Sequence, residues 1–272
     1  MGASAQRSQK GPARVEETLM IDSGGLKRIA IREGVPQAIV EKDVALSLAL
    51  KGISQSRLME HLVFKGGTAI RKGYFERARF SEDLDFTASG AGRVKCLGML
   101  RGALEGIDSS GFRFEKIEDE GNRAGLKASV RFKGPLAYAQ RIRFDISFRE
   151  NLIKEPLLRP MLDPYGLGEA GLRIMDLEEI LSEKLHALGN RSAARDLYDV
   201  WFLLEKGVVI DRPMLVKKFA YYDEKFDTGK TVDNMRKCKE SWTRDLGHLV
   251  RELPSYHPIE KVVENKLSEV VR

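Results

Sequence analysis

The chain has 272 residues, of which 42% are hydrophobic and 32% are charged, and its formal net charge is +6. This composition excludes a wholly disordered chain and a collagen-like fibre, and no apolar run approaches the roughly 18 residues that a membrane-spanning helix needs. Because the N-terminal segment is polar and the two cysteines lie far apart in the sequence, we expect a cytoplasmic protein without a secretory signal, a disulfide framework or a zinc site.

Helices and strands alternate in the first part of the predicted structure. Residues 37–50 follow a proline and are mostly apolar, which predicts a buried helix. Residues 62–64 form an apolar run that ends at a Gly-Gly pair, which indicates a strand and a tight turn, and Thr68 is expected to cap the short helix after it. Apolar and polar residues alternate over 80–86, which predicts a strand with acidic side chains on its polar face. A further helix is expected over residues 94–107.

Three more strands are predicted over residues 112–117, 126–132 and 141–148, where apolar residues recur at every second position for most or all of each segment. These elements together predict an α+β lobe with a mixed sheet, which we assign to residues 18–160. A helical C-terminal lobe is assigned to residues 161–272.

The C-terminal lobe is predicted to begin its first helix at Asp176. Glu179, three residues later, is the expected capping-box partner of that aspartate. The helix is expected to end near residues 189–190, where a glycine and an asparagine follow each other. Further helices are predicted over residues 193–204, 212–221, 232–249 and 259–271.

The most informative feature for function is a pair of aspartates, Asp83 and Asp85, on the predicted strand over 80–86. Residues two apart on a strand point to the same side, and two carboxylates so close together are costly unless a cation lies between them. Hard divalent ions such as Mg²⁺ or Mn²⁺ take oxygen ligands and leave room for phosphate oxygens. Asp145 is the only acid on the polar face of its predicted strand. We therefore expect Asp145 as the third carboxylate of a metal site that supports displacement at phosphorus.

A glycine turn precedes the acid pair and suggests where a triphosphate binds. Gly66 and Gly67 have no Cβ atoms, so their backbone N–H groups can approach phosphate oxygens, and Thr68 lies at the expected helix start, where the dipole is positive. Taken alone, a Gly-Gly pair is an ordinary turn and an Asp-x-Asp pair is a solvated strand edge. Their combination with Asp145 favours a nucleoside triphosphate (NTP) site.

The same segments carry a family resemblance. Residues 64–70 (FKGGTAI) and 79–86 (RFSEDLDF) resemble the signature of the AbiEii/AbiGii toxin family. The resemblance extends to residues 41–43 (EKD), 183–188 (EKLHAL) and 195–201 (RDLYDVW). These toxins are nucleotidyltransferase-like proteins of bacterial and archaeal toxin–antitoxin and abortive-infection systems. The resemblance implies a fold of the DNA-polymerase-β nucleotidyltransferase type.

The resemblance also implies roles for individual residues. Catalytic roles are expected for Asp83, Asp85, Lys184 and Asp196. Nucleotide contacts are expected from Gly66, Gly67, Thr68, Arg79, Ser81 and Lys184. On physical grounds the Lys184 ammonium suits the β- and γ-phosphates, although Glu183 and Lys184 are also compatible with the solvated face of an amphipathic helix. Asp196 is expected either to hold Lys184 in place or to act as a base, and Arg195 to pair with Asp196 or Asp199.

We therefore predict a metal-dependent nucleotidyltransferase toxin that transfers nucleotides from an NTP to an RNA hydroxyl. The expected acceptor is the 3′ end of tRNA, and its modification would block translation until a cognate antitoxin intervenes. Three alternatives stay open: transfer to a protein or a small molecule, a GTP-binding module without transfer activity, and a family member retained only for protein contacts.

Overall fold

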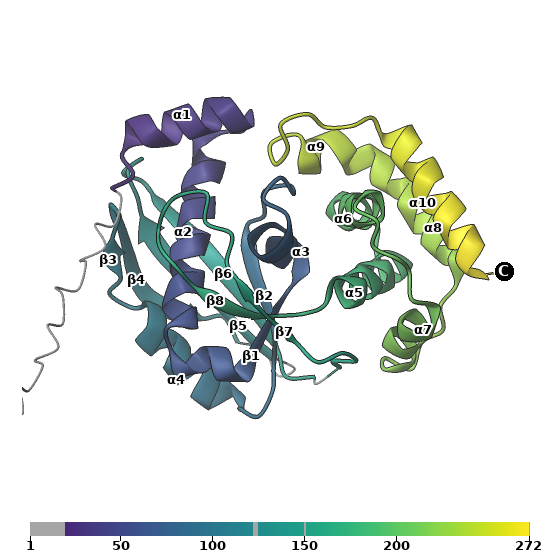
Figure 1. Cartoon of the computed structure of the whole chain (residues 1–272), viewed down its shortest axis with the longest axis horizontal. Helices are drawn as coiled ribbons and strands as arrows, with labels where there is room; N and C mark the ends of the chain where they lie inside the picture. Colours follow the sequence, from purple (N-terminus) through teal and green to yellow (C-terminus); the bar gives the residue numbers. More distant parts are fainter. Residues whose placement is uncertain (1–19, 122–124, 150, 272) are drawn as a thin grey trace, which may run out of the picture.

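The computed structural model describes residues 20–121, 125–149 and 151–271. A mixed sheet with its covering helices forms one part of the molecule, and a group of helices forms the other part (Figure 1). The strands are β1 (Leu62–Lys65), β2 (Asp83–Ala88), β3 (Asp108–Ser109), β4 (Phe112–Asp119), β5 (Gly125–Lys133), β6 (Ala139–Ser147), β7 (Leu157–Pro160) and β8 (Gly171–Ile174). Their order in the sheet is β3-β4-β5-β6-β2-β1-β8-β7.

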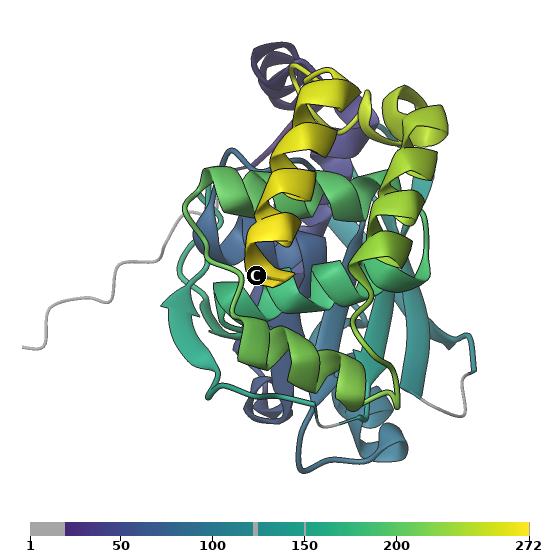
Figure 2. The ribbon, with the colours of Figure 1, turned by 90° about the vertical axis from the view of Figure 1, so that its right-hand side faces the viewer.

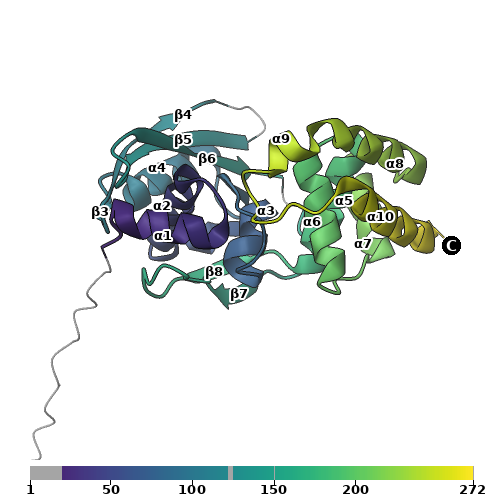
Figure 3. The ribbon, with the colours of Figure 1, turned by 90° about the horizontal axis from the view of Figure 1, so that it is seen from above.

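The described residues form helices in both parts of the molecule. The α-helices are α1 (Ser23–Glu33), α2 (Gln37–Ser54), α3 (Gly66–Ala69), α4 (Arg93–Leu104), α5 (Leu177–Asn190), α6 (Ala194–Glu205), α7 (Arg212–Ala220), α8 (Thr228–Lys237), α9 (Trp242–Leu246) and α10 (Tyr256–Val271). Shorter turns are η1 (Arg57–His61), η2 (Ile70–Tyr74) and η3 (Cys238–Ser241). Helices α1 to α4 accompany the sheet, and α5 to α10 form the helical part (Figure 3). None of the helices in the described ranges is both long and apolar enough to cross a lipid bilayer.

The sheet is mixed, as the sequence predicts. Strand β2 runs parallel to β6, and β1 runs parallel to β8, while the other neighbours are antiparallel. Helices α2 and α4 cover one face, which buries the apolar residues that alternate along β5 and β6. The opposite face carries the alternate, polar residues of β2 and β6. The acid pair is therefore on the sheet face that α2 and α4 leave uncovered.

The helical part is built around α5, which contacts α6, α7 and α8. Figure 2 looks onto this part, with α10 on its outside, where it packs against α6 and α8. Asp176 begins α5 as predicted, and its carboxylate accepts a hydrogen bond from the Glu178 N–H. The structure therefore confirms the expected α+β arrangement with C-terminal helices.

Several local predictions are wrong, and each has a physical reason. Thr68 does not cap a helix: it lies inside α3, is fully buried, and its hydroxyl donates to the Asp83 carbonyl. Glu179 does not complete a capping box, because its carboxylate accepts the backbone N–H groups of Ile153 and Lys154. In both cases a long-range partner replaces the local one that the sequence pattern suggests.

Other differences concern element boundaries. The helix expected over 232–249 is divided into α8, η3 and α9. Helix α1 and strands β7 and β8 were not predicted. Strand β8 lies beyond residue 160 and still belongs to the sheet, so the sheet extends into the segment that we assigned to the helical lobe. The division of the chain at residue 160 remains a prediction.

A buried cluster of charges ties the sheet part together. Asp43 on α2 is fully buried, and its Oδ2 lies 2.6 Å from the Lys72 Nζ. Arg71 lies 3.4 Å from the same carboxylate, and the Tyr165 hydroxyl donates to it. Although burial acts to raise the pKa of Asp43, Lys72 and Arg71 hold it below its usual range. The cluster therefore joins α2, η2 and the segment between β7 and β8 through an ionised carboxylate.

Removing this carboxylate should destabilise the protein strongly. Asp43→Ala leaves two buried cations without their partner, and breaking a buried ion pair in this way costs about 3–5 kcal/mol. Urea denaturation should show a loss of that size in the free energy of unfolding. As a control, Glu269→Ala removes one partner of the exposed Lys266–Glu269 pair and should cost less than about 1 kcal/mol. Equal effects of the two substitutions would show that the Asp43 cluster is not structural.

Candidate active site

Two adjoining hollows lie between β1 and β2 on one side and α5 and α6 on the other. One has a volume of about 280 Å³ and reaches Tyr222; we call it the Tyr222 hollow. The other has a volume of about 300 Å³ and reaches Ser81; we call it the Ser81 hollow. Four residues line both hollows: Asp85, Lys184, Arg191 and Asp196. Every predicted site residue except Thr68 lines one hollow or both, so we take their junction as the candidate active site.

Strand pairing brings the three predicted metal-binding carboxylates onto one sheet face. Asp83 and Asp85 are two residues apart on β2, and Asp85 stands opposite Asp145 in the parallel register with β6. On the other side Asp85 stands opposite Lys65 of β1. Asp83 and Asp85 both line the Ser81 hollow, so their side chains meet rather than diverge. The alternation rule for strands thus correctly predicts the shared face.

The position of Asp85 is unfavourable for a charged carboxylate. Burial raises its pKa to about 6, and the neighbouring carboxylates of Asp83 and Asp145 act in the same direction. Lys184 and Lys65 oppose this shift but do not cancel it. The raised pKa of Asp85 is therefore mainly a consequence of burial, and a cation bound beside it would favour its ionised form.

Asp83 provides a second sign that the site is made for a cation. Its Oδ1 is buried and has no hydrogen-bond partner among the described residues. Asp145 is less enclosed than Asp85: its side chain is 48% exposed, and its carboxylate lies 3.5 Å from the Lys127 Nζ. No group of three or more histidine, cysteine, aspartate or glutamate side chains in the described ranges is already arranged as a metal site. The orphaned oxygen of Asp83 and the raised pKa of Asp85 nevertheless fit a divalent cation held by this pair.

The two glycines of the turn make room for side chains as well as for a ligand. Gly66 has a φ of +77°, in the left-handed region that favours glycine, and a Cβ there would collide with the Asp85 carboxylate. A Cβ on Gly67 would lie 2.7 Å from the Arg79 Nη2. Larger residues at either position would therefore displace a predicted site residue.

Lys184 is fixed at the junction by two carboxylates of α6. Its Nζ lies 2.8 Å from an oxygen of Asp196 and 2.8 Å from an oxygen of Asp199. Burial alone would lower the pKa of Lys184, but these carboxylates outweigh it and raise the pKa, so the amine stays protonated. Its side chain is only 13% exposed, so the alternative of a solvated helix face does not apply to it. Arg191 also pairs with Asp196, at 2.7 Å, while its own side chain is 66% exposed.

Asp199 has a role that the sequence analysis missed. Both of its carboxylate oxygens accept hydrogen bonds from Arg79, at 2.7 and 2.8 Å. Arg195 does not pair with Asp196 or Asp199 as expected; it pairs with Glu82 at 2.7 Å. The three-residue spacing of Asp196 and Asp199 placed them on one helix face, and Lys184 was an expected partner of Asp196. The sequence did not identify Arg79, 120 residues away, as the partner of Asp199.

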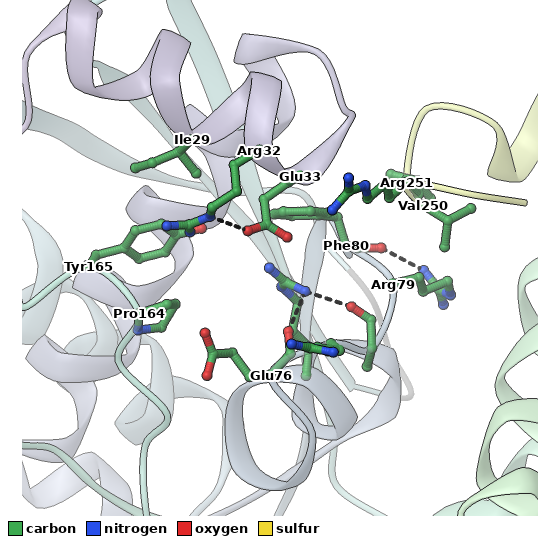
Figure 4. Close-up of a pocket in the computed structure, with 14 residues that line it drawn as sticks. Ile29, Arg32, Glu33, Glu76, Arg79, Phe80, Pro164, Tyr165, Val250 and Arg251 are labelled. Atoms are coloured by element: carbon green, nitrogen blue, oxygen red, sulfur yellow. Dashed lines mark hydrogen bonds and ion pairs between the residues drawn. The ribbon is translucent and has the colours of Figure 1, made fainter.

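A third hollow, with a volume of about 460 Å³, lies where α1, residues 76–80 and residues 249–251 meet (Figure 4). It is lined by five arginines, and Arg79 is the one that also lines the Ser81 hollow. Neither Asp83 nor Asp85 lines it, and the guanidinium of Arg79 is already engaged by Asp199 and by the Phe80 carbonyl. The larger hollow is thus separate from the acid pair, and we do not place the active site there.

Comparison with known proteins identifies the family and a shared fold. The family model described as nucleotidyl transferase AbiEii toxin, type IV toxin–antitoxin system, matches residues 48–265. Among solved structures, the chain is similar to MenT4, a nucleotidyltransferase toxin from Mycobacterium tuberculosis H37Rv, with a TM-score of 0.69 and 21% sequence identity. That similarity covers 90% of this chain and 88% of the MenT4 chain, and it shows a shared fold. No curated protein matches the chain.

The raised pKa of Asp85 predicts that the stability of the protein depends on pH. Because the folded-state pKa of about 6 lies above the ordinary value of 3.8, the folded protein binds this proton more tightly than the unfolded chain does. The free energy of unfolding therefore falls as the pH rises from about 4 to about 6. In metal-free buffer, the change in the free energy of unfolding caused by Asp85→Asn should be more stabilising at pH 8 than at pH 4, by roughly 1–3 kcal/mol.

Chemical denaturation of the wild-type protein and the variant at the two pH values measures this difference. Asp108→Asn is a suitable control, because Asp108 is 59% exposed and lies outside both hollows. The control should show a difference of less than about 1 kcal/mol between the two pH values. If Asp85→Asn changes the free energy of unfolding equally at pH 4 and pH 8, the pKa of Asp85 is not raised in the folded protein.

Proposed function

The chain belongs to the AbiEii nucleotidyltransferase toxin family, and from this we propose that it transfers a nucleotide from an NTP to the 3′ hydroxyl of an RNA, with tRNA as the expected acceptor. Membership of the family makes the chain a toxin nucleotidyltransferase. The observation that carries the finer proposal is the junction of the two hollows, where Asp83 and Asp85 of the sheet meet Lys184 of the helical part.

We place the triphosphate in the Ser81 hollow. This hollow combines the Gly67 backbone and the Ser81 hydroxyl with two partly exposed guanidinium groups, Arg191 and Arg195. Arginine side chains bind phosphate oxygens through paired N–H donors. Lys184 adds a fixed positive charge at the inner end of this hollow, because Asp196 and Asp199 hold it there.

Asp83 and Asp85 would hold a divalent cation, Mg²⁺ or Mn²⁺, with Asp145 as an additional carboxylate on the neighbouring strand. When bound, such an ion neutralises charge on the phosphates and lowers the pKa of an attacking hydroxyl. The side chains of the protein do the positioning: the carboxylates face the α-phosphate, and Lys184 and Arg191 face the departing phosphates. Asp196 acts in this scheme as the residue that positions Lys184 rather than as a base, because Lys184 and Arg191 hold its pKa below the usual range despite burial.

The proposed reaction is an in-line displacement at the α-phosphorus. The acceptor hydroxyl oxygen forms a bond to that phosphorus, and the bond from the phosphorus to the oxygen bridging to the β-phosphorus breaks. Pyrophosphate leaves with the electron pair of the broken bond. The hydroxyl proton passes to a carboxylate of the junction and from there to solvent.

The proposed biological setting is the cytoplasm, with a cognate antitoxin as the opposing partner. Addition of nucleotides to the 3′ end of tRNA would prevent aminoacylation and so block translation. The net charge of +6 is compatible with a polyanionic acceptor.

An incubation with labelled NTPs tests the proposal. The protein, Mg²⁺, each labelled NTP in turn and total tRNA should give labelled RNA and release pyrophosphate. Asp83→Asn, which keeps the size of the side chain, should lower this rate by about 100-fold or more, because the orphaned carboxylate oxygen is lost. Asp108→Asn serves again as the control and should leave the rate unchanged.

Three results would each require a change in the proposed function or in the proposed role of the acid pair. GTP binding without pyrophosphate release on any acceptor would favour a nucleotide-binding module. If the label appears on protein or on a small molecule but not on RNA, the acceptor belongs to that class and is not RNA. Retention of the wild-type rate by Asp83→Asn would contradict the proposed role of the acid pair.

Cation binding can be tested without measuring activity. Millimolar Mg²⁺ or Mn²⁺ should stabilise the wild-type protein at pH 8, because a cation that binds only the folded state shifts the folding equilibrium. We expect a rise of about 2–4 °C in the thermal midpoint. The rise should be absent in Asp83→Asn and present in Asp108→Asn, and an equal rise in all three proteins would mean that the ions act elsewhere.

A further inference from the structure

The Tyr222 hollow is lined by both charged and apolar side chains. Asp85 and Lys184 line the part that it shares with the Ser81 hollow. Tyr222 and the aliphatic side chains of Ile180 and Ala187 on α5 line this hollow alone, as do Lys65 and Glu183. A ligand that fills this hollow therefore needs an apolar, flat portion and a polar portion next to Asp85. A nucleotide has this character.

Tyr222 is held in a fixed orientation. The side-chain amide of Asn151 donates to the Tyr222 hydroxyl at 3.1 Å. The ring stacks on His186 of α5, with ring centres 4.6 Å apart and planes 18° apart. His186 is itself fixed by Glu224, whose carboxylate lies 2.9 Å from the Nε2. A ring that is already ordered loses little side-chain entropy when a base stacks near it.

A cation without a carboxylate partner accompanies this ring. The guanidinium carbon of Arg149 lies 5.5 Å from the centre of the Tyr222 ring. Arg149 is exposed and makes no ion pair with any carboxylate of the described residues. Two basic residues of the sheet are already engaged, because Lys127 pairs with Asp145 and Arg141 pairs with Glu118. Arg149 is therefore available to bind a phosphate group.

The direction of the reaction decides which nucleotide lies here. In an in-line displacement, the attacking oxygen and the leaving oxygen are on opposite sides of the phosphorus. If the departing phosphates occupy the Ser81 hollow, the attacking hydroxyl must arrive from the Tyr222 hollow. Asp85 lines both hollows and so lies between the two sides.

We propose that the Tyr222 hollow is the subsite for the terminal nucleotide of the RNA acceptor, with the base on Tyr222 and a backbone phosphate on Arg149. This inference rests on the proposed transfer to RNA. It assigns Tyr222 and Arg149 to positioning of the acceptor and leaves the base of the incoming NTP outside this hollow. Neither residue carries out a bond-making step.

Steady-state kinetics with a short single-stranded RNA acceptor separates the two substrates. Tyr222→Ala should raise the KM for the acceptor by about tenfold or more, as expected for a lost base–aromatic stack, and should change the KM for the NTP by less than about twofold. Tyr222→Phe keeps the ring and its stack on His186 but loses the hydrogen bond from Asn151, so its acceptor KM should stay much closer to the wild-type value than that of Tyr222→Ala. Arg149→Ala should also raise the acceptor KM, and it should weaken the salt dependence of acceptor binding.

Matched controls use a tyrosine and an arginine that line neither hollow. Tyr138→Ala removes an exposed tyrosine, and Arg57→Ala removes an exposed arginine. Both should leave the acceptor KM unchanged. Thermal midpoints of all variants show whether each protein is folded. Direct binding of the labelled RNA, measured by fluorescence anisotropy without NTP or metal, gives a readout that is independent of turnover.

The outcomes distinguish this inference from the proposed function. If the wild-type protein transfers nucleotides to RNA but folded Tyr222→Ala keeps the wild-type acceptor KM, the subsite is wrong and the transfer function stands. If the NTP KM rises instead, Tyr222 lies under the base of the incoming nucleotide and the subsite is again wrong. If the wild-type protein transfers nothing to RNA and binds no RNA, the proposed function fails and this inference fails with it.

Discussion

The ammonium group of Lys184 lies between the carboxylates of Asp196 and Asp199, and the rest of the active site depends on this contact. Asp199 also binds Arg79 through both oxygens, which fixes the segment that leads into the acid pair. Asp196 also binds Arg191, which lines both hollows. Two neighbouring carboxylates on one helix thereby set the positions of three cations, one from the sheet part and two from the helical part. Loss of Asp199 would leave the buried guanidinium of Arg79 without a carboxylate partner, and loss of Asp196 would leave Lys184 with Asp199 alone.

Asp85, on the opposite side of the junction, is in an environment that disfavours its charged form. Burial raises its pKa to about 6, with smaller contributions from Asp83 and Asp145, and Lys184 and Lys65 do not offset the shift. A protein selected only for stability would avoid this arrangement, because a buried carboxylate with a raised pKa lowers the free energy of unfolding near neutral pH. The cost is understandable if cations and a triphosphate complete the site. Stability and substrate binding would in this way be coupled through Asp85.

The sequence predicts those parts of the site that depend on local geometry. The period of two places Asp83 and Asp85 on one face, and the three-residue spacing places Asp196 and Asp199 on one helix face. Asp145 was expected beside the acid pair, but the register that sets it opposite Asp85 was not predicted, and neither was the tertiary contact of Arg79 with Asp199. Tyr222 gave no sequence signal, because it lies in an irregular turn after α7.

The structure also explains why the glycine turn and the acid-pair segment occur together as one unit. Gly66 leaves space for the Asp85 carboxylate, and Gly67 leaves space for the Arg79 guanidinium. Thr68 donates its hydroxyl to the Asp83 carbonyl at the first position of β2. Three consecutive residues of the turn thus each contact a different residue of the later segment. A change in either segment would therefore act on the other by direct contact, and the carboxylates could not keep their positions if the turn were replaced by an ordinary one of different sequence.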